Sequence, residues 1–146
     1  MLSILVPVRN ESENLEGIFE YFEENIKNLN YEVLLINDFS EDDTLDRANK
    51  LTDKYKNFKI LDNKKKGLGG AINLGIIKSS GKNIAIMMAD QSDDINDLIR
   101  YNEIMNTHNC DEVFGSRFLN ESKVNDYPIQ KLILNRIFNL FVSLIF

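Results

Sequence analysis

Residues 2–8 read LSILVPV, a strand-length run in which apolar side chains stand mostly at consecutive positions rather than at every second one. A strand that is covered on both faces has this pattern, whereas a strand on a half-exposed sheet alternates apolar with polar residues. Similar runs follow at residues 32–36, 58–61 and 83–88, with a weaker one at 112–114. The sequence therefore predicts five short strands in a sheet that is covered on both faces.

Helix-length stretches separate these runs, at residues 12–29, 44–55, 70–79 and 94–107. In the first, Asn10 and Ser12 are available as N-caps. Its apolar residues stand at helical spacing, at Leu15, Ile18, Phe19, Phe22 and Ile26. Strands that alternate with helices predict an α/β protein, a three-layer α/β/α sandwich with a mostly parallel sheet and right-handed crossovers.

The composition is that of a folded globular chain of 146 residues, with 43% apolar and 27% charged residues. A net charge of −6 argues against a general nucleic-acid binder. Cys110 is the single cysteine, so an intrachain disulfide is excluded, and one His108 beside it makes a structural zinc site implausible. The N-terminus lacks the basic region and the apolar length of a signal peptide. We expect an intracellular protein.

Polar and acidic residues follow the predicted strands, at residues 7–11, 37–44, 89–94 and 115–117. Ligands of open α/β sheets bind at the carboxyl ends of the strands, so a site is expected there. Asp90, Asp93 and Asp94 carry the oxygen ligands that Mg²⁺ prefers. The alternative is that Asp93 or Asp94 caps the next helix, as Asp42 or Asp43 would cap the helix at Thr44.

Residues 64–71 read KKKGLGGA, where glycines allow the backbone to approach a ligand and the following helix N-terminus can attract an anion. The dinucleotide-binding and P-loop patterns both fail here, since Ile72 stands where the former needs a third glycine. A solvated turn remains the alternative.

The last segment, residues 128–146, is predicted to be a helix apart from a core of residues 1–127. Its polar residues recur every four positions, at Lys131, Asn135, Asn139 and Ser143, and almost everything else is apolar. Such a wide apolar face packs against further chain, as in the core of a longer protein, or lies in a membrane interface.

Five motifs in order resemble family 2 glycosyltransferases of the GT-A fold, particularly the polyprenyl-phosphate and dolichol-phosphate sugar transferases. They are P-x-x-N-E at 7–11, N-D-x-S-x-D at 37–42, K-G-x-G-x-A-x-N-x-G at 66–75, M-A-D-x-S-D-D at 88–94 and G-S-R at 115–117. The resemblance runs from residue 2 to about residue 139. It implies a nucleotide-sugar pocket formed by Pro7, Arg9, Glu11, Ile36, Asp38, Gly69, Ala89 and Asp90.

The resemblance also implies a divalent cation, Mg²⁺ or Mn²⁺, held by Asp90, Ser92 and Asp93. Met88 stands where the family usually has another aspartate. Arg117 and Lys131 are implied to hold the acceptor phosphate, with Asp90 and Arg117 as the catalytic residues. A generic receiver-like α/β domain is disfavoured, because no lysine follows the fifth predicted strand.

The implied activity is the inverting transfer of a sugar from a GDP- or UDP-linked donor to a polyprenyl or dolichyl phosphate, by a protein peripheral to the cytoplasmic face of the membrane. Members of the family normally continue beyond this length, so we expect a truncated or split chain with weak turnover of its own. The alternative is a non-catalytic nucleotide-binding module that needs a partner subunit or a missing C-terminal segment.

Overall fold

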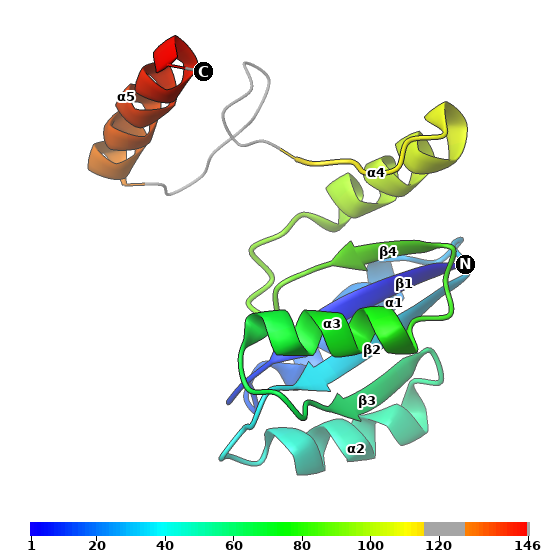
Figure 1. Cartoon of the computed structure of the whole chain (residues 1–146). Helices are drawn as coiled ribbons and strands as arrows, with labels where there is room; N and C mark the ends of the chain where they lie inside the picture. The colour runs from blue at the N-terminus through cyan, green and yellow to red at the C-terminus, as the bar shows by residue number, and fades with distance from the viewer. Residues whose placement is uncertain (116–127, 146) are drawn as a thin grey trace. The chain divides into compact units, whose positions relative to one another are not determined.

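The computed structural model describes residues 1–115 and 128–145, apart from the side chain of residue 143. The chain forms two compact units, residues 1–113 and residues 114–146, and each is described by itself. Figure 1 shows the first unit as a sheet with helices on its faces. The predicted boundary at residue 127 stays a prediction.

Within the described residues, four strands form one parallel sheet in the order β3-β2-β1-β4. The strands are β1 (Leu2–Val8), β2 (Tyr31–Asn37), β3 (Phe58–Asp62) and β4 (Asn83–Ile86). The helices are α1 (Leu15–Asn25), α2 (Thr44–Lys54), α3 (Leu68–Lys78), α4 (Ile95–His108) and α5 (Ile129–Ile145). The predicted α/β class with a parallel sheet is confirmed.

The prediction of a strand at residues 112–114 is wrong. These residues have no strand pairing, and Phe114 is 82% exposed. Three residues with one acidic side chain carry too little apolar surface to order a strand by burial. The run at residues 83–88 also pairs for a shorter length than expected, because β4 ends at Ile86.

Alternate residues of β1 and β2 point to opposite faces of the sheet and contribute to two separate hydrophobic cores. Ile4, Val6, Val33 and Leu35 pack with α1, whereas the opposite face is covered by α3. The core under α3 contains Leu5, Leu34, Ile36 and Ala71. Both strands are buried at every position, which confirms that the consecutive apolar pattern marks a sheet covered on both faces.

Gly75 lets α3 approach β1 closely. A Cβ atom at this position would lie 2.9 Å from Cδ1 of Leu5 and 3.2 Å from Cδ1 of Ile36. Contacts that short cannot be relieved without a shift of the core. The glycine therefore fixes how closely α3 lies on the strands whose ends form the candidate site.

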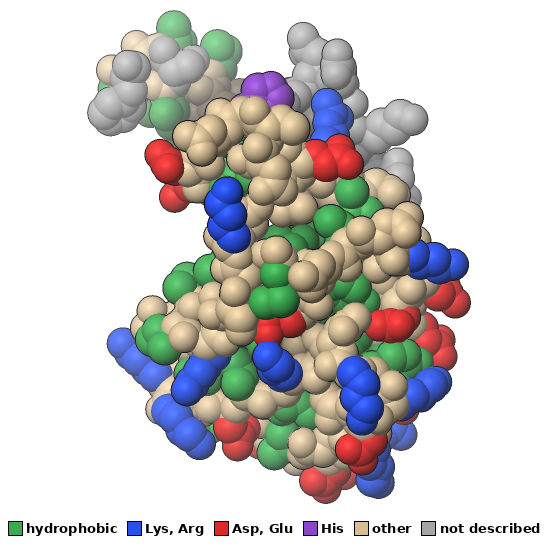
Figure 2. All heavy atoms as spheres, turned by 90° about the vertical axis from the view of Figure 1, so that its right-hand side faces the viewer, with side chains coloured by type: hydrophobic (Ala, Val, Ile, Leu, Met, Phe, Trp, Pro, Cys, Tyr) green, Lys and Arg blue, Asp and Glu red, His purple; other side chains and the backbone are tan. Residues whose placement is uncertain are grey.

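Glu32 organises the opposite, amino-terminal edge of the sheet, where Figure 2 shows acidic and basic side chains interspersed. Its carboxylate, 4% exposed, accepts hydrogen bonds from Ser3 Oγ at 2.7 Å, Ser80 N at 2.6 Å and Lys59 Nζ at 2.7 Å. Burial alone would raise the pKa of Glu32, but these hydrogen bonds outweigh it and lower the pKa to about 2. The buried carboxylate thereby joins β1, β3 and the α3–β4 connection.

The helix α5 covers Ile129–Ile145 of the predicted segment, and residue 146 lies outside the described residues. Many of its apolar side chains are exposed, among them Ile129, Leu134, Phe138, Leu140 and Leu144. Among the described residues, no helix has the length and apolar character needed to span a bilayer.

Candidate nucleotide-sugar site

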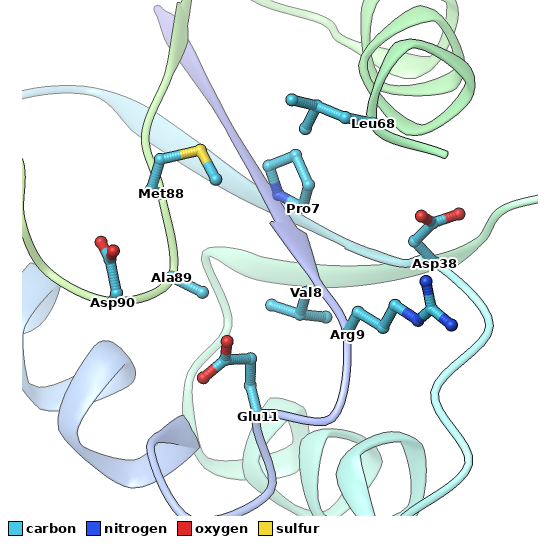
Figure 3. Close-up of a pocket in the computed structure, with 9 residues that line it drawn as sticks. All are labelled: Pro7, Val8, Arg9, Glu11, Asp38, Leu68, Met88, Ala89 and Asp90. Carbon is cyan, nitrogen blue, oxygen red and sulfur yellow. The ribbon is translucent and has the colours of Figure 1, made fainter. Parts of the chain in front are cut away.

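The carboxyl ends of β1, β2 and β4 meet at a cavity of about 260 Å³ (Figure 3). It is lined by Pro7, Val8, Arg9, Glu11, Asp38, Leu68, Met88, Ala89 and Asp90. β1 supplies the floor, and the segments after β2 and β4 supply Asp38 and Asp90 from its two sides. The two aspartates that the sequence singled out thus share one cavity, although 52 positions separate them in the chain.

Most of the predicted nucleotide-sugar residues line this cavity, namely Pro7, Arg9, Glu11, Asp38, Ala89 and Asp90. Ile36 does not, because it is fully buried under α3 with Leu5 and Leu34. Gly69 is exposed on the first turn of α3, and its neighbour Leu68 is the lining residue instead. Residues two positions apart on a strand share a face, so what separates the two residues is their place along the chain: Ile36 lies within β2 under α3, whereas Asp38 follows the last residue of the strand.

Asp38 holds the glycine-containing loop against the end of β2. Its carboxylate, in a residue 7% exposed, accepts Gly67 N at 2.9 Å and 3.0 Å through its two oxygens and Asn63 Nδ2 at 2.7 Å. Gly67 has a φ of 111°, a conformation that favours glycine. The glycine signal in the sequence is therefore explained by this loop, which places Leu68 on the cavity wall.

Asn63 is a residue that the sequence analysis missed. It is buried, it donates to Asp38, and it forms two further hydrogen bonds with the backbone of Lys65. The available signal was its place directly after β3, the position at which the other strands also carry polar residues. In this structure Asn63 fixes both the Asp38 carboxylate and the loop beside it.

The loop after β1 is tied to the loop after β2. Asn10 N donates to Ser40 Oγ at 3.1 Å, and Glu41 N donates to Asn10 Oδ1 at 2.8 Å. Glu11 N donates to Thr44 Oγ1 at 2.9 Å. Asn10 and Ser12 are thus not the N-caps of α1 that the sequence predicts, since the N-cap position is occupied by Asn14. Their polar groups fix the two loops that carry Arg9, Glu11 and Asp38.

Asp42 strengthens the same junction. It accepts Thr44 N at 3.0 Å and Ser12 N at 3.3 Å. Hydrogen bonds from Thr44 and then Ser12 lower the pKa of Asp42 to about 2, because they favour its charged form. Asp43 occupies the N-cap position of α2 without a side-chain cap bond, so the predicted capping interaction comes from Asp42.

The aspartates after β4 have three different local roles. Asp90 lines the cavity and accepts Ser92 N at 3.0 Å, and hydrogen bonds from Ser92 lower the pKa of Asp90. Asp93 accepts Met88 N at 2.9 Å. Asp94 accepts Asn96 N at 2.8 Å, which confirms it as the N-cap of α4. The roles of Ser92 and Asp93 as metal ligands stay predictions.

Three of these loops contain non-glycine residues with positive φ, at Asn10 (56°), Phe39 (59°) and Gln91 (56°). Each is next to a residue that lines the cavity. Such conformations are uncommon for residues other than glycine and concentrate at ligand-binding sites. The strained positions therefore support the same edge of the sheet as a functional site.

The structure tests neither of the predicted acceptor-phosphate residues. Arg117 lies outside the described residues. Lys131 is an exposed residue of α5, in the second unit. Their predicted roles are not tested by the geometry of the cavity.

Comparisons with known proteins identify the family of the chain. Residues 3–144 match the family described as Glycosyl transferase family 2. A dolichol-phosphate mannosyltransferase of Pyrococcus furiosus is 30% identical over 92% of this chain and 38% of its own length. A dolichyl-phosphate beta-glucosyltransferase of Trichomonas vaginalis, ALG5D, is 32% identical over 90% of this chain and 45% of its own length. The chain thus spans less than half of either relative.

Two solved structures share the fold. The mannosyltransferase PcManGT of Pyrobaculum calidifontis, in complex with GDP-Man and Mn²⁺, has a TM-score of 0.51 and 20% identity over 61% of this chain and 27% of its own. S. aureus TarS has a TM-score of 0.57 and 18% identity over 72% of this chain and 20% of its own. With the family match over residues 3–144, the chain belongs to glycosyl transferase family 2.

Proposed function

We propose that this chain binds a nucleotide-diphosphate sugar, GDP- or UDP-linked, and transfers its sugar to a polyprenyl or dolichyl phosphate with inversion at the anomeric carbon. The observation that carries the proposal is the cavity in which Arg9, Glu11, Asp38 and Asp90 meet at the carboxyl edge of the sheet. The dolichol-phosphate and dolichyl-phosphate transferases among the relatives support this class of acceptor.

The Asp38 side and the Asp90 side of the cavity suit different parts of the nucleotide sugar. Asp38 is a buried carboxylate, and such a group accepts hydrogen bonds from the N–H groups of a base or from ribose hydroxyls. In Figure 3 the Arg9 side chain extends toward Asp38, so it places a positive charge beside the path of an anionic ligand. We assign the nucleoside to the Asp38 side and the diphosphate and sugar to the Asp90 side.

The side-chain oxygens at the Asp90 side of the cavity fit a metal ion that is held partly by the substrate. Among residues 1–115 and 128–145, no three His, Cys, Asp or Glu residues form a group that could hold a metal ion alone. Mg²⁺, however, is commonly bound by one or two carboxylates together with substrate phosphates. Asp90 would hold it, assisted by Ser92 or Asp93. When bound, the cation stabilises the negative charge that develops on the leaving diphosphate.

The reaction needs no strong general base. A phosphate oxygen of the acceptor is already anionic and attacks the anomeric carbon, while the bond from that carbon to the diphosphate breaks and its electron pair leaves with the nucleoside diphosphate. We propose that Arg117 and Lys131 orient the acceptor phosphate. We further propose that α5, with its exposed apolar side chains, lies at the cytoplasmic membrane surface.

A second candidate is a nucleotide-binding module that reacts only with a partner chain. The cavity supports this candidate equally, because it can hold a nucleotide whether or not sugar transfer follows. Calorimetric titration with GDP and UDP, with and without Mn²⁺, tests the donor site common to both candidates. Sugar transfer to a polyprenyl phosphate in vesicles separates them, because the module binds without transfer.

Asp90→Asn provides the matched test of the cation site. We expect it to remove the Mn²⁺-dependent part of nucleotide affinity, because the amide keeps the shape of the side chain but not its charge. Asp97→Asn, at an exposed position on α4, is the control and should bind as the unmodified chain does. Failure of the unmodified chain to bind either nucleotide would reject both candidates.

A further inference from the structure

The segment from residue 63 to residue 89 differs in charge from the rest of the chain. It contains five lysines and no acidic residue, although the whole chain has 23 acidic against 17 basic residues. All five lysines are exposed, at Lys64, Lys65, Lys66, Lys78 and Lys82. Within the part of the chain that the structure describes, ion pairs join Arg47 to Glu16 and Lys59 to Glu32, and neither involves the five lysines. The segment therefore carries uncompensated positive charge in a chain that is acidic overall.

This segment contains α3 and β4, which belong to one face of the first unit, here called the α3 face. α3 lies over β1 and β2 on the side of the sheet opposite α1 (Figure 1). Ile86 pairs with Leu5, a residue of the core under α3, so Ile86 and Ile84 point to the α3 face. On the opposite side of the sheet, α1 carries four glutamates and no basic residue. The two faces of the sheet thus differ in the sign of their charge.

An acidic strand residue on the α3 face does not offset this charge. Glu32 pairs with Ser3, two positions before Leu5, and so shares the face of Leu5. Glu32 is buried, and its carboxylate accepts a hydrogen bond from Lys59 Nζ at 2.7 Å. The exposed lysines therefore determine the charge that the α3 face presents to a partner.

The α3 face also exposes large apolar side chains. They are Leu68, Ile76 and Ile77 of α3, Ile84 and Ile86 of β4, and Met88, which follows β4. The most exposed of them is Ile77, at 68%. Leu68 and Met88 both line the cavity, so the apolar residues of α3 and those of the β4 segment meet at its mouth. Exposed apolar side chains bordered by charged residues are typical of an interaction surface.

The combination of apolar and basic residues suits an anionic lipid bilayer. Isoleucine side chains enter the boundary between headgroups and acyl chains, while lysines attract the lipid phosphates. A second copy of the chain would bring two sets of lysines together, and a nucleic acid would leave the apolar residues uncovered.

We propose that the α3 face docks on the surface of an anionic membrane. The inference rests on the proposed function, because a lipid phosphate is the acceptor there. Docking through the α3 face places the cavity mouth, at Leu68 and Met88, beside the bilayer that holds this acceptor. The contact is separate from the one proposed for α5.

The single cysteine allows one position to be labelled at a time. In a Cys110→Ser background, Ile77→Cys carries an NBD fluorophore on the α3 face, and Asn49→Cys carries it on α2 as the matched control. We expect vesicles of phosphatidylcholine and phosphatidylserine to shift the emission of the Ile77→Cys label to the blue and to leave the control label unchanged. A shift at both positions, or at neither, overturns the inference.

Vesicle sedimentation gives a second readout that does not depend on a label. Lys78→Gln with Lys82→Gln should weaken binding to the same vesicles by about 5-fold for each lysine, the contribution of one basic residue at an anionic membrane surface. Lys50→Gln with Lys56→Gln, at exposed positions on and after α2, is the control and should bind as the unmodified chain does. Equal weakening in both pairs would mean that only the overall charge matters, and the inference would fail.

The remaining outcomes separate this inference from its competitor and from the proposed function. A blue shift of the Ile77→Cys label without vesicles, growing with protein concentration, assigns the α3 face to a second copy and overturns membrane docking. Calorimetric binding of GDP or UDP without a vesicle-induced shift of the label overturns docking and leaves the donor site intact. Docking by a chain that binds neither nucleotide supports the membrane contact and overturns the proposed function.

Discussion

Replacing Glu32 by glutamine tests a buried carboxylate that joins β1, β3 and the α3–β4 connection. The substitution keeps the volume of the side chain and removes its charge. The amide can still accept the bonds from Ser3 and Ser80 through its oxygen, but its NH₂ group then faces the Lys59 ammonium. The change therefore removes a charge-assisted interaction and weakens the remaining two.

The expected loss of stability in Glu32→Gln follows from the lowered pKa of Glu32. Glu32 titrates at about 2 in the folded chain against an ordinary value of 4.5. At 1.36 kcal/mol per pKa unit, this difference corresponds to roughly 3 kcal/mol in favour of the charged form. Because the folded-state pKa is lowered, this stabilisation is complete above about pH 4.5 and is lost as the pH falls toward 2.

Urea unfolding followed by circular dichroism measures the effect. We expect Glu32→Gln to lower the free energy of unfolding by about 3 kcal/mol at pH 7, and the gap to the unmodified chain to shrink by about 2 kcal/mol at pH 3. Glu24→Gln, at an exposed position of α1, is the control and should change stability by less than about 0.5 kcal/mol at either pH. A gap that is the same at pH 7 and pH 3 would refute the reasoning.

Three further substitutions test the fold and the loops around the cavity. Gly75→Ala should lower the free energy of unfolding by about 1–3 kcal/mol in urea titrations, because the new methyl group would lie 2.9 Å from Leu5 Cδ1; an unchanged midpoint would show that α3 shifts freely. Asp94→Ala should cost about 1 kcal/mol by the same measurement, because α4 loses its cap bond to Asn96 N, and Asp94→Asn should recover most of it. Asp38→Asn should weaken nucleotide binding in calorimetry and speed amide hydrogen exchange at Gly67, since the amide group cannot accept Gly67 N and Asn63 Nδ2 as the carboxylate does. Unchanged exchange would show that Asp38 does not hold the loop at Gly67.

Much of the site could be predicted because its placement follows from local pattern. The run at residues 2–8 coincides with β1, and the parallel arrangement puts the residues after β1, β2 and β4 at one edge. A strand end is located where a run of apolar residues stops, and this can be seen from adjacent residues of the sequence alone. Pro7, Arg9, Glu11, Asp38, Ala89 and Asp90 line one cavity, as the resemblance to family 2 glycosyltransferases implied, whereas Ile36 and Gly69 of the same implied set do not.

The hydrogen-bond partners of these residues could not be predicted, because they depend on the register between strands. Asn37 lies opposite Asp62 in the β2–β3 pairing, and this brings Asp38 next to Asn63 across 25 positions of the chain. Likewise Asn10 looks like a local cap, but the packing of β1 against β2 places Ser40 and Glu41 nearer. Apart from the strand expected at residues 112–114, the sequence by itself determined which segments are strands and helices, since short-range apolar periodicity decides that. Only the tertiary structure decided which polar groups satisfy one another, because a buried donor pairs with whatever acceptor the sheet register places within reach.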